Sequence, residues 1–238
     1  MQNLVSPCIK PVAPLRDFVS SAAQRTFSHK ATIIGQGAQS RDLFLIVRGS
    51  VTFRLETPSG HDLVLAIAYA GEFFGETGLF ESDALNAWRV RARGACDVAQ
   101  VSHTALENDL PLFASLYPTL VAQLSARLDR QERRAGELAF CDSRARVLSA
   151  LHYLASAPDA QTKADGVAIS VTRVELASMS AVSREAVGRI LKDFERQGII
   201  CAKGRAILIL TQRGPDALKM PLRPERYARP SWEAESRL

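Results

Sequence analysis

The chain has 238 residues, of which 47% are hydrophobic, and carries a formal net charge of +5 with a pI near 9.2. This length allows two modest domains with cores of their own, and the composition excludes a wholly disordered protein. No apolar run approaches the roughly 20 residues of a membrane helix, and the first residues lack the apolar core of a secretory signal. We therefore expect a cytoplasmic protein with no membrane partner. The positive net charge is compatible with a polyanionic partner, but it is not sufficient evidence for one.

The cysteines and histidines show no spacing typical of a metal site. The four cysteines are scattered at Cys8, Cys96, Cys141 and Cys201. The four histidines are also dispersed, at His29, His61, His103 and His152. A zinc site, an iron–sulfur cluster or a disulfide framework requires close pairs. We therefore expect ordinary thiols and no metal or covalent cofactor, with haem ligation by one histidine left as an alternative.

Residues 31–101 are predicted to form short strands. Apolar runs such as Leu43–Val47, Leu63–Ala68 and Val98–Val101 are separated by glycines. Strands of this length at regular spacing, divided by turn residues, are typical of an antiparallel sandwich or barrel.

Residues 111–139 change to a helical period. Over three heptads the seam positions follow alternating steps of four and three residues, at Tyr117, Val121, Leu124, Leu128, Gln131, Ala135 and Leu138. Such a seam needs a partner helix, and the simplest partner is the same helix of a second copy. Gln131 would be the single polar seam residue, which can fix the register. We expect a parallel homodimer, with packing of the helix on its own domain as the alternative.

The remainder of the chain is predicted to form a second domain and a tail. A second helical stretch, Ser143–Ser156, is followed by a polar loop over residues 158–166, and we place the domain boundary near residues 139–143. From Gly214 the chain combines four prolines with many charges, which is typical of a flexible tail.

Residues 170–210 carry the most informative pattern. Thr172 with Glu175 forms a capping box, which starts a helix. After a short break at 180–182, Ser183 caps a second helix that Gly198 ends. Two capped helices joined by a tight break indicate a helix-turn-helix.

The second of these helices has two distinct faces. Its apolar stripe consists of Val187, Ile190, Leu191 and Phe194. Its opposite face is polar and largely basic, with Glu185, Arg189, Lys192 and Arg196, and Arg184 beside them. A recognition helix enters the major groove with its first turns at the base edges. An ordinary solvated surface helix is the alternative, which the surrounding caps and turn disfavour.

The chemistry of the exposed side chains suits the edges of base pairs. Arginine offers a fork to guanine O6 and N7, and a carboxylate accepts from cytosine N4, so Arg184, Glu185 and Arg189 are the predicted base readers. The predicted backbone contacts are Thr172, Arg173, Ser183, Lys192 and Lys203. Two short strands, 199–202 and 206–210, flank Lys203-Gly204 and predict a β-hairpin wing.

Three stretches resemble the cyclic-AMP receptor protein and FNR-type (CRP/FNR) regulators over roughly residues 25–212. They are Gly71–Phe80 (GEFFGETGLF), Leu138–Asp142 (LAFCD) and Ser183–Lys192 (SREAVGRILK). The resemblance implies an α+β fold with a cyclic-nucleotide-binding β-roll (jelly roll) over 1–110, a dimerisation helix over 111–139, a winged helix-turn-helix over 140–212 and a tail over 213–238. It further implies an inverted-repeat operator with TGTGA-like half-sites, and RNA polymerase as a partner.

In the turn of the helix-turn-helix, the family often has glycine where this chain has Ala181. A positive φ there would cost about 1–2 kcal/mol.

The ligand pocket departs from the family pattern. The family's cyclic-AMP cassette begins with Gly75-Glu76, which are present, but Leu85-Asn86 stand where an Arg-Ser pair should hold the cyclic phosphate. Two small hydroxyl residues expected on the long helix are replaced by Gln131 and Glu132. A buried phosphate without a cationic fork loses its strongest charge-assisted contact. These departures disfavour ordinary cyclic AMP recognition.

Clustered arginines suggest a larger anionic effector. The predicted effector set is Gly75, Glu76, Arg89, Arg91, Arg93, Arg130 and Arg134. Arg89, Arg91 and Arg93 alternate along a predicted strand and would share a face. Guanidinium forks suit cyclic di-GMP, to which some members of the family respond. Cyclic di-GMP is the favoured effector, with cyclic AMP, another nucleotide or no nucleotide as alternatives.

We therefore predict a homodimeric DNA-binding transcription regulator rather than an enzyme. The C-terminal half contains no glycine-rich phosphate loop, nucleophile elbow or metal cluster. A nucleotide-regulated enzyme and a sensor that does not bind DNA are the rival classes.

Overall fold

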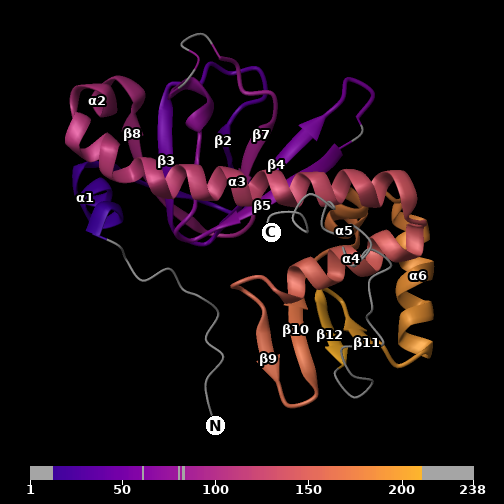
Figure 1. The fold of residues 1–238 in the computed structure, drawn as a ribbon. Coiled ribbons are helices and arrows are strands. Elements are labelled where there is room, and N and C mark those ends of the chain that lie inside the picture. The colour runs from indigo at the N-terminus through magenta and orange to yellow at the C-terminus, as the bar shows by residue number, and fades with distance from the viewer. Residues whose placement is uncertain (1–12, 61, 80, 82–83, 211–238) are drawn as a thin grey trace, which may run out of the picture. The chain divides into compact units, whose positions relative to one another are not determined.

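The computed structural model describes residues 13–60, 62–79, 81 and 84–210, and its contacts divide the chain into two compact units that meet between Arg133 and Arg134 (Figure 1). The predicted domain limits stay predictions, and the predicted tail over 213–238 lies outside the described residues.

The first unit is built on two four-stranded antiparallel sheets, with strand orders β1-β8-β3-β6 and β2-β7-β4-β5. Their strands are β1 (Ala23–Phe27), β2 (Thr32–Ile34), β3 (Asp42–Arg48), β4 (Ser50–Glu56), β5 (Asp62–Tyr69), β6 (Phe73–Phe74), β7 (Arg89–Ala92) and β8 (Cys96–Ser102). The non-sequential strand order comes from long connections between strands that are distant in the sequence, as in a β-roll.

An aromatic cluster forms part of the core of the β-roll. Phe44 and Phe74 stack at 4.8 Å between ring centroids, and Phe53 meets Phe74 edge-on at 6.4 Å. Phe53 and its neighbours Val51 and Val90 are buried in the same cluster. These residues alternate along β4 and β7 with polar side chains, because successive residues of a strand point to opposite faces.

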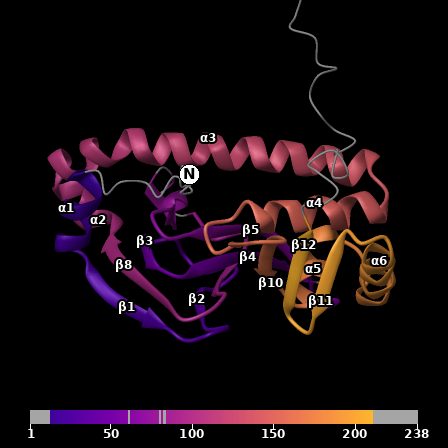
Figure 2. The same cartoon turned by 90° about the horizontal axis from the view of Figure 1, so that it is seen from below.

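Among the described residues, four helical segments accompany the sheets of this unit. They are α1 (Ala13–Ser21), the 3-10 helix η1 (Glu76–Leu79), α2 (His103–Asn108) and the first part of α3 (Leu110–Phe140). Figures 1 and 2 both show α1 and α2 beside the start of α3. Leu116 and Leu120 of α3 are buried in a second cluster with Phe18 of α1 and Leu106 of α2. The predicted helix over 111–139 therefore forms, one residue longer at each end.

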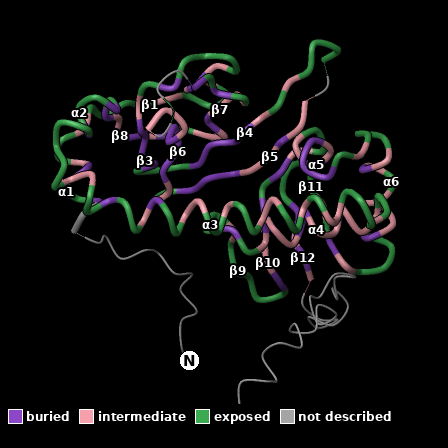
Figure 3. Tube along the Cα trace, turned by 45° about the horizontal axis from the view of Figure 1, so that its top comes forward, coloured by how far each residue is buried: buried purple, intermediate pink, exposed green. Residues whose placement is uncertain are grey.

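Up to residue 210, the second unit contains the end of α3, three further helices and a four-stranded sheet of order β11-β12-β10-β9. Its elements are α4 (Ser143–Ala155), β9 (Gln161–Lys163), β10 (Gly166–Ser170), α5 (Arg173–Ser180), α6 (Arg184–Arg196), β11 (Ile200–Lys203) and β12 (Ala206–Leu210). In Figure 3 the buried residues of this unit gather along α4, α5, α6 and β12, whereas β9 is exposed throughout.

Two elements differ from the sequence-based prediction. β9 lies inside the predicted loop over 158–166, and β1 lies before the predicted strand region. Both are edge strands with mostly or wholly exposed residues, so neither shows the apolar alternation that marks a strand in sequence. The predicted α+β class is confirmed. Within the described residues, no helix is both long and apolar enough to cross a membrane.

Candidate DNA interface and effector site

The helix pair α5–α6 is capped by its own side chains. The Thr172 hydroxyl accepts from the backbone N–H of Glu175 at 3.0 Å, and the Ser183 hydroxyl accepts from that of Ala186 at 3.2 Å. Between the helices, Ala181 adopts a left-handed conformation with φ of 51° and ψ of 45°. Ala181 therefore has the positive φ that the family pattern suggested for this position. The left-handed conformation reverses the chain in a short turn.

The end of α6 is a Schellman motif. Gly198 has φ of 67°, its N–H donates to the Glu195 carbonyl at 3.0 Å, and the N–H of Ile199 donates to the Phe194 carbonyl at 2.9 Å. The helix thus begins and ends where the sequence signals place it.

α6 buries one face and exposes the other. Val187, Leu191 and Phe194 are at most 3% exposed, which fixes the rotation of the helix about its axis. The opposite face is solvent-exposed and carries Glu185, Arg189, Lys192 and Arg196, with Arg184 exposed on its flank. Each predicted base reader is therefore on a surface that DNA could reach.

The predicted backbone contacts lie around this face. Arg173, Lys192 and Lys203 are exposed, and Lys203 ends β11 next to the Gly204-Arg205 turn of the β11–β12 hairpin. This hairpin is the predicted wing. Thr172 and Ser183 already accept backbone hydrogen bonds as helix caps, so their hydroxyls would approach a phosphate as donors.

In the first unit, Gly75 and Glu76 stand at the start of η1. A Cβ on Gly75 would lie 2.4 Å from the Asp42 carbonyl oxygen, so glycine is required for β3 to pass this closely. Glu76 is 9% exposed and forms an ion pair with Arg127 of α3 at 2.7 Å. Arg127 also donates to the Phe73 carbonyl at 2.8 Å. Arg127 was not among the predicted site residues; its position one turn before Gln131 on the same helix is the signal that could have identified it.

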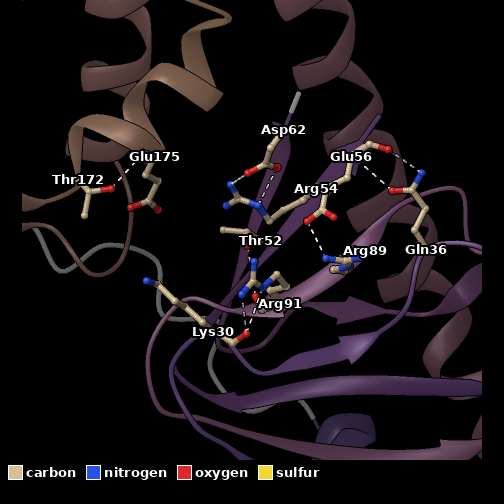
Figure 4. Close-up of polar contacts among 10 residues, drawn as sticks. All are labelled: Lys30, Gln36, Thr52, Arg54, Glu56, Asp62, Arg89, Arg91, Thr172 and Glu175. Atoms are coloured by element: carbon tan, nitrogen blue, oxygen red, sulfur yellow. Dashed lines mark hydrogen bonds and ion pairs between the residues drawn. The ribbon is translucent and has the colours of Figure 1, made fainter. Parts of the chain in front are cut away.

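Three arginines lie on the outer face of the sheet β2-β7-β4-β5. Arg54 and Arg89 face each other across β4 and β7 in the register of the sheet, and Arg91 lies two residues further along β7 (Figure 4). Arg54 forms an ion pair with Asp62. Arg89 forms one with Glu56 at 2.7 Å.

The third arginine of this row has a different kind of partner. Arg91 donates from Nε and Nη2 to the Lys30 carbonyl at 3.1 and 3.0 Å (Figure 4). A carbonyl is a neutral acceptor, so these two bonds do not neutralise the charge of Arg91. Arg93 follows the last residue of β7, so only Arg89 and Arg91 of the predicted trio share a strand face.

The predicted effector residues do not form a single site. The guanidinium of Arg127 lies 5.0 Å from the ring centroid of Phe53, which belongs to the inner face of β4. Arg54 and Arg89 lie on the other face, because Phe53 and Arg54 are consecutive in the strand. Glu76 and the arginine row are therefore on opposite sides of the sheet.

The two arginines predicted on α3 have separate partners. Arg130 lies 3.7 Å from Glu72 within the first unit. Arg134 donates to the Met179 carbonyl at 2.8 Å within the second unit, and burial lowers its pKa. Arg134 is therefore already bound to the helix-turn-helix.

The Leu85-Asn86 segment carries no cation at the positions that depart from the family pattern. Leu85 is 61% exposed, and the amide of Asn86 donates to the Ala38 carbonyl at 2.9 Å. The side chain of Asn86 thus binds the chain segment around Ala38, where Leu85 also forms a β-bridge with Gln39.

The predicted dimer seam is largely exposed. Tyr117, Val121, Leu128 and Leu138 are between 41% and 60% exposed, which is unusual for apolar side chains on one helix. Ala135 is exposed and Leu124 is half-buried. Gln131, the predicted polar residue of the seam, donates its amide to the Leu65 carbonyl at 3.0 Å.

Comparisons with known proteins agree with both halves of this description. Residues 24–110 match the family model described as cyclic nucleotide-binding domain, and residues 145–214 match the Crp-like helix-turn-helix domain. The chain is 37% identical over 194 residues to the cAMP-activated global transcriptional regulator Vfr of Pseudomonas aeruginosa, covering 80% of this chain and 90% of the relative. It is 36% identical to the cAMP-activated global transcriptional regulator CRP of Escherichia coli, covering 82% and 93%. The chain belongs to the CRP/FNR family of transcription regulators.

A solved structure of a global regulator is also similar to the chain. The c-di-GMP responsive global regulator CLP of Xanthomonas campestris is 30% identical, with a TM-score of 0.74, covering 83% of this chain and 98% of that one. As a member of the CRP/FNR family, the chain is a DNA-binding transcription regulator with a cyclic-nucleotide-binding domain. Its relatives are regulators, which confirms the prediction that it is not an enzyme.

Proposed function

We propose that the chain is a homodimeric transcription regulator that acts in the cytoplasm, reads an inverted-repeat operator through α6 and responds to cyclic di-GMP. The proposed DNA recognition is supported above all by the exposed face of α6, on which Glu185 and Arg189 lie opposite the buried stripe. Arg184 and Arg189 would read guanines, and Glu185 would accept from cytosine N4, in TGTGA-like half-sites. Arg173, Lys192 and Lys203 would bind phosphates.

Two substitutions on α6 separate base reading from phosphate binding. Arg189→Ala should weaken operator binding by about 10- to 100-fold and relax the preference at one base pair, since a bidentate pair is worth about 1–3 kcal/mol. Lys192→Ala should weaken binding to all sequences alike. It should also reduce by about 1 the slope of the logarithm of the binding constant against the logarithm of the salt concentration. Fluorescence anisotropy with operator and scrambled duplexes at several salt concentrations measures both. If operator affinity is unchanged in both Arg184→Ala and Arg189→Ala, the proposed reading is wrong.

The exposed apolar residues of α3 support the homodimer. Leu128 and Tyr117 are 60% and 49% exposed, and a second copy of the same helix would cover them. Two copies of α6 can enter successive major grooves when they lie about 34 Å apart. A dimer on such an operator would then act through contact with RNA polymerase.

The arginine row supports cyclic di-GMP as the effector. Three guanidinium groups on adjacent strands would meet the two phosphates and the guanine edges by forks and stacking. Arg54 and Arg89 would exchange Asp62 and Glu56 for phosphate oxygens, and Arg91 would add a charge that its bonds to the Lys30 carbonyl do not neutralise. The similar structure that is described as c-di-GMP responsive agrees with this choice.

Cyclic AMP is the second candidate because Vfr and CRP are described as cAMP-activated. In this case the buried Glu76–Arg127 pair would hold the ligand, with the carboxylate at a ribose hydroxyl and the guanidinium at the phosphate.

Titration calorimetry with cyclic di-GMP, cyclic AMP and cyclic GMP tests the effector. We expect cyclic di-GMP to bind, and Arg89→Gln to weaken its affinity at least about 10-fold, as loss of a charge-assisted fork implies. Arg48→Gln, which removes an exposed arginine paired with Asp97, is the control and should leave binding unchanged. Binding of cyclic AMP alone, lost in Arg127→Gln, would overturn the proposal in favour of the second candidate.

A further inference from the structure

Arg144 joins the first turn of α4 to the last turn of α6. Its Nη2 donates to Gln197 Oε1 at 2.7 Å, and its Nη1 forms an ion pair with Asp193. Gln197 Nε2 in turn donates to Asp193 Oδ2 at 3.1 Å, so the three polar side chains bind one another. The guanidinium carbon of Arg144 also lies 4.4 Å from the ring centroid of Phe194.

The ring under Arg144 belongs to the anchor of the recognition helix. Phe194 is fully buried, whereas the side chains of Arg144 and Asp193 are 39% and 40% exposed. Arg144 therefore covers the buried ring from the solvent side while it binds two polar residues on the flank of α6. A planar fork that stacks and binds two acceptors at once is a property of arginine that lysine lacks.

Asp193 lies where its carboxylate, if unpaired, could interact with the DNA-reading face of α6. It follows Arg189 by four residues, and side chains at i and i+4 are neighbours on a helix surface. A free carboxylate there would compete with guanine for the Arg189 guanidinium and would repel the DNA phosphates. In the structure, this carboxylate is bound to Arg144 of α4 instead.

We propose that Arg144 is a positioning residue for DNA recognition: it sequesters the Asp193 carboxylate from Arg189 and holds the C-terminal turn of α6 on α4. The inference rests on the proposed role of Arg189 as a base reader. Arg144 itself need not touch DNA, because its guanidinium is occupied by Asp193, Gln197 and the Phe194 ring.

A double-mutant cycle on the full chain tests this role. Arg144→Met should weaken operator binding by about 10-fold, which corresponds to the loss of one charge-assisted interaction. Asp193→Asn alone should change affinity by less than about 3-fold, and Arg144→Met/Asp193→Asn should recover most of the lost affinity. Arg144→Lys should fall between wild type and Arg144→Met, because it keeps the charge without the fork.

The readouts are operator affinity and its salt dependence, together with the thermal unfolding midpoint of each variant. Arg48→Met is the matched control: it breaks a surface arginine–aspartate pair of the first unit and should leave DNA binding unchanged. A merely structural Arg144 would lower the unfolding midpoint and affinity together, and Asp193→Asn would not restore affinity; this result would overturn the inference. Unchanged affinity in Arg144→Met would also overturn it. The proposed function fails separately, if both Arg184→Ala and Arg189→Ala bind the operator like wild type.

Discussion

Glu76 of η1 and Arg127 of α3 form an ion pair of 2.7 Å, with only 12% and 15% of their side chains exposed. The pair connects η1, which follows β6, to the long helix, and the Phe53 ring lies against the guanidinium. Because both charges are almost withdrawn from water, each depends on the other for its solvation.

We expect Arg127→Met to lower the free energy of unfolding by about 2–4 kcal/mol, because it leaves the Glu76 carboxylate buried without its charged partner. Urea unfolding followed by circular dichroism measures the loss. Arg127→Met/Glu76→Gln should recover much of it, since the double variant removes both charges. Equal losses in the single and double variants would show that the pair contributes through packing alone.

Substitution of Leu128 should dissociate the proposed dimer. Leu128→Asp places a charge in the exposed seam of α3 in both copies, and we expect the dimer dissociation constant to rise by about 100-fold or more. Ala126→Asp introduces the same charge at an exposed position on another side of α3 and serves as the control. Analytical ultracentrifugation measures both, and similar dissociation constants for the two variants would place the dimer contact elsewhere.

Because Ala181 has a left-handed conformation, we expect its substitution by glycine to stabilise the folded chain. With φ of 51°, the Cβ of Ala181 is strained, so Ala181→Gly should raise the free energy of unfolding by about 1 kcal/mol. Ala177→Gly makes the same chemical change within α5 and should lower it by about 0.5–1 kcal/mol. Thermal unfolding of both variants gives the comparison; a destabilised Ala181→Gly would contradict the expected strain.

Burial of His152 in α4 should make stability depend on pH. Desolvation lowers its pKa below the ordinary value of 6.5, so the unfolded chain binds a proton more readily than the folded one. Above about pH 6.5 His152 is neutral in both the folded and the unfolded chain, so it does not reduce the free energy of unfolding. As the pH falls below 6.5, protonation favours the unfolded chain and the free energy of unfolding decreases. Between pH 7.5 and 5.5, the unfolding midpoint of wild type should therefore fall more steeply than that of His152→Leu. Parallel pH profiles for the two proteins would assign the dependence to other groups.

The helix-turn-helix could be predicted closely because its signals are local. The Thr172 and Ser183 hydroxyls each accept a bond from the backbone three residues later, and Gly198 ends α6 through contacts within five residues. The polar and apolar faces of α6 follow from the helical period alone. The effector residues were harder to predict because their partners are far away in the sequence.

The helix caps and the two faces of the recognition helix follow from the amino-acid sequence, since hydrogen bonding at a cap and the side-chain period of a helix act over a few residues. Which charged side chains pair with one another depends on tertiary packing. Arg127 reaches Glu76 across 51 residues, and Arg144 reaches Asp193 across 49. Tertiary packing also separates Glu76 from the arginine row, because the two candidate groups lie on opposite faces of one sheet. Such pairings depend on how distant strands and helices pack, and packing joins residues whose sequence neighbours do not reveal the contact.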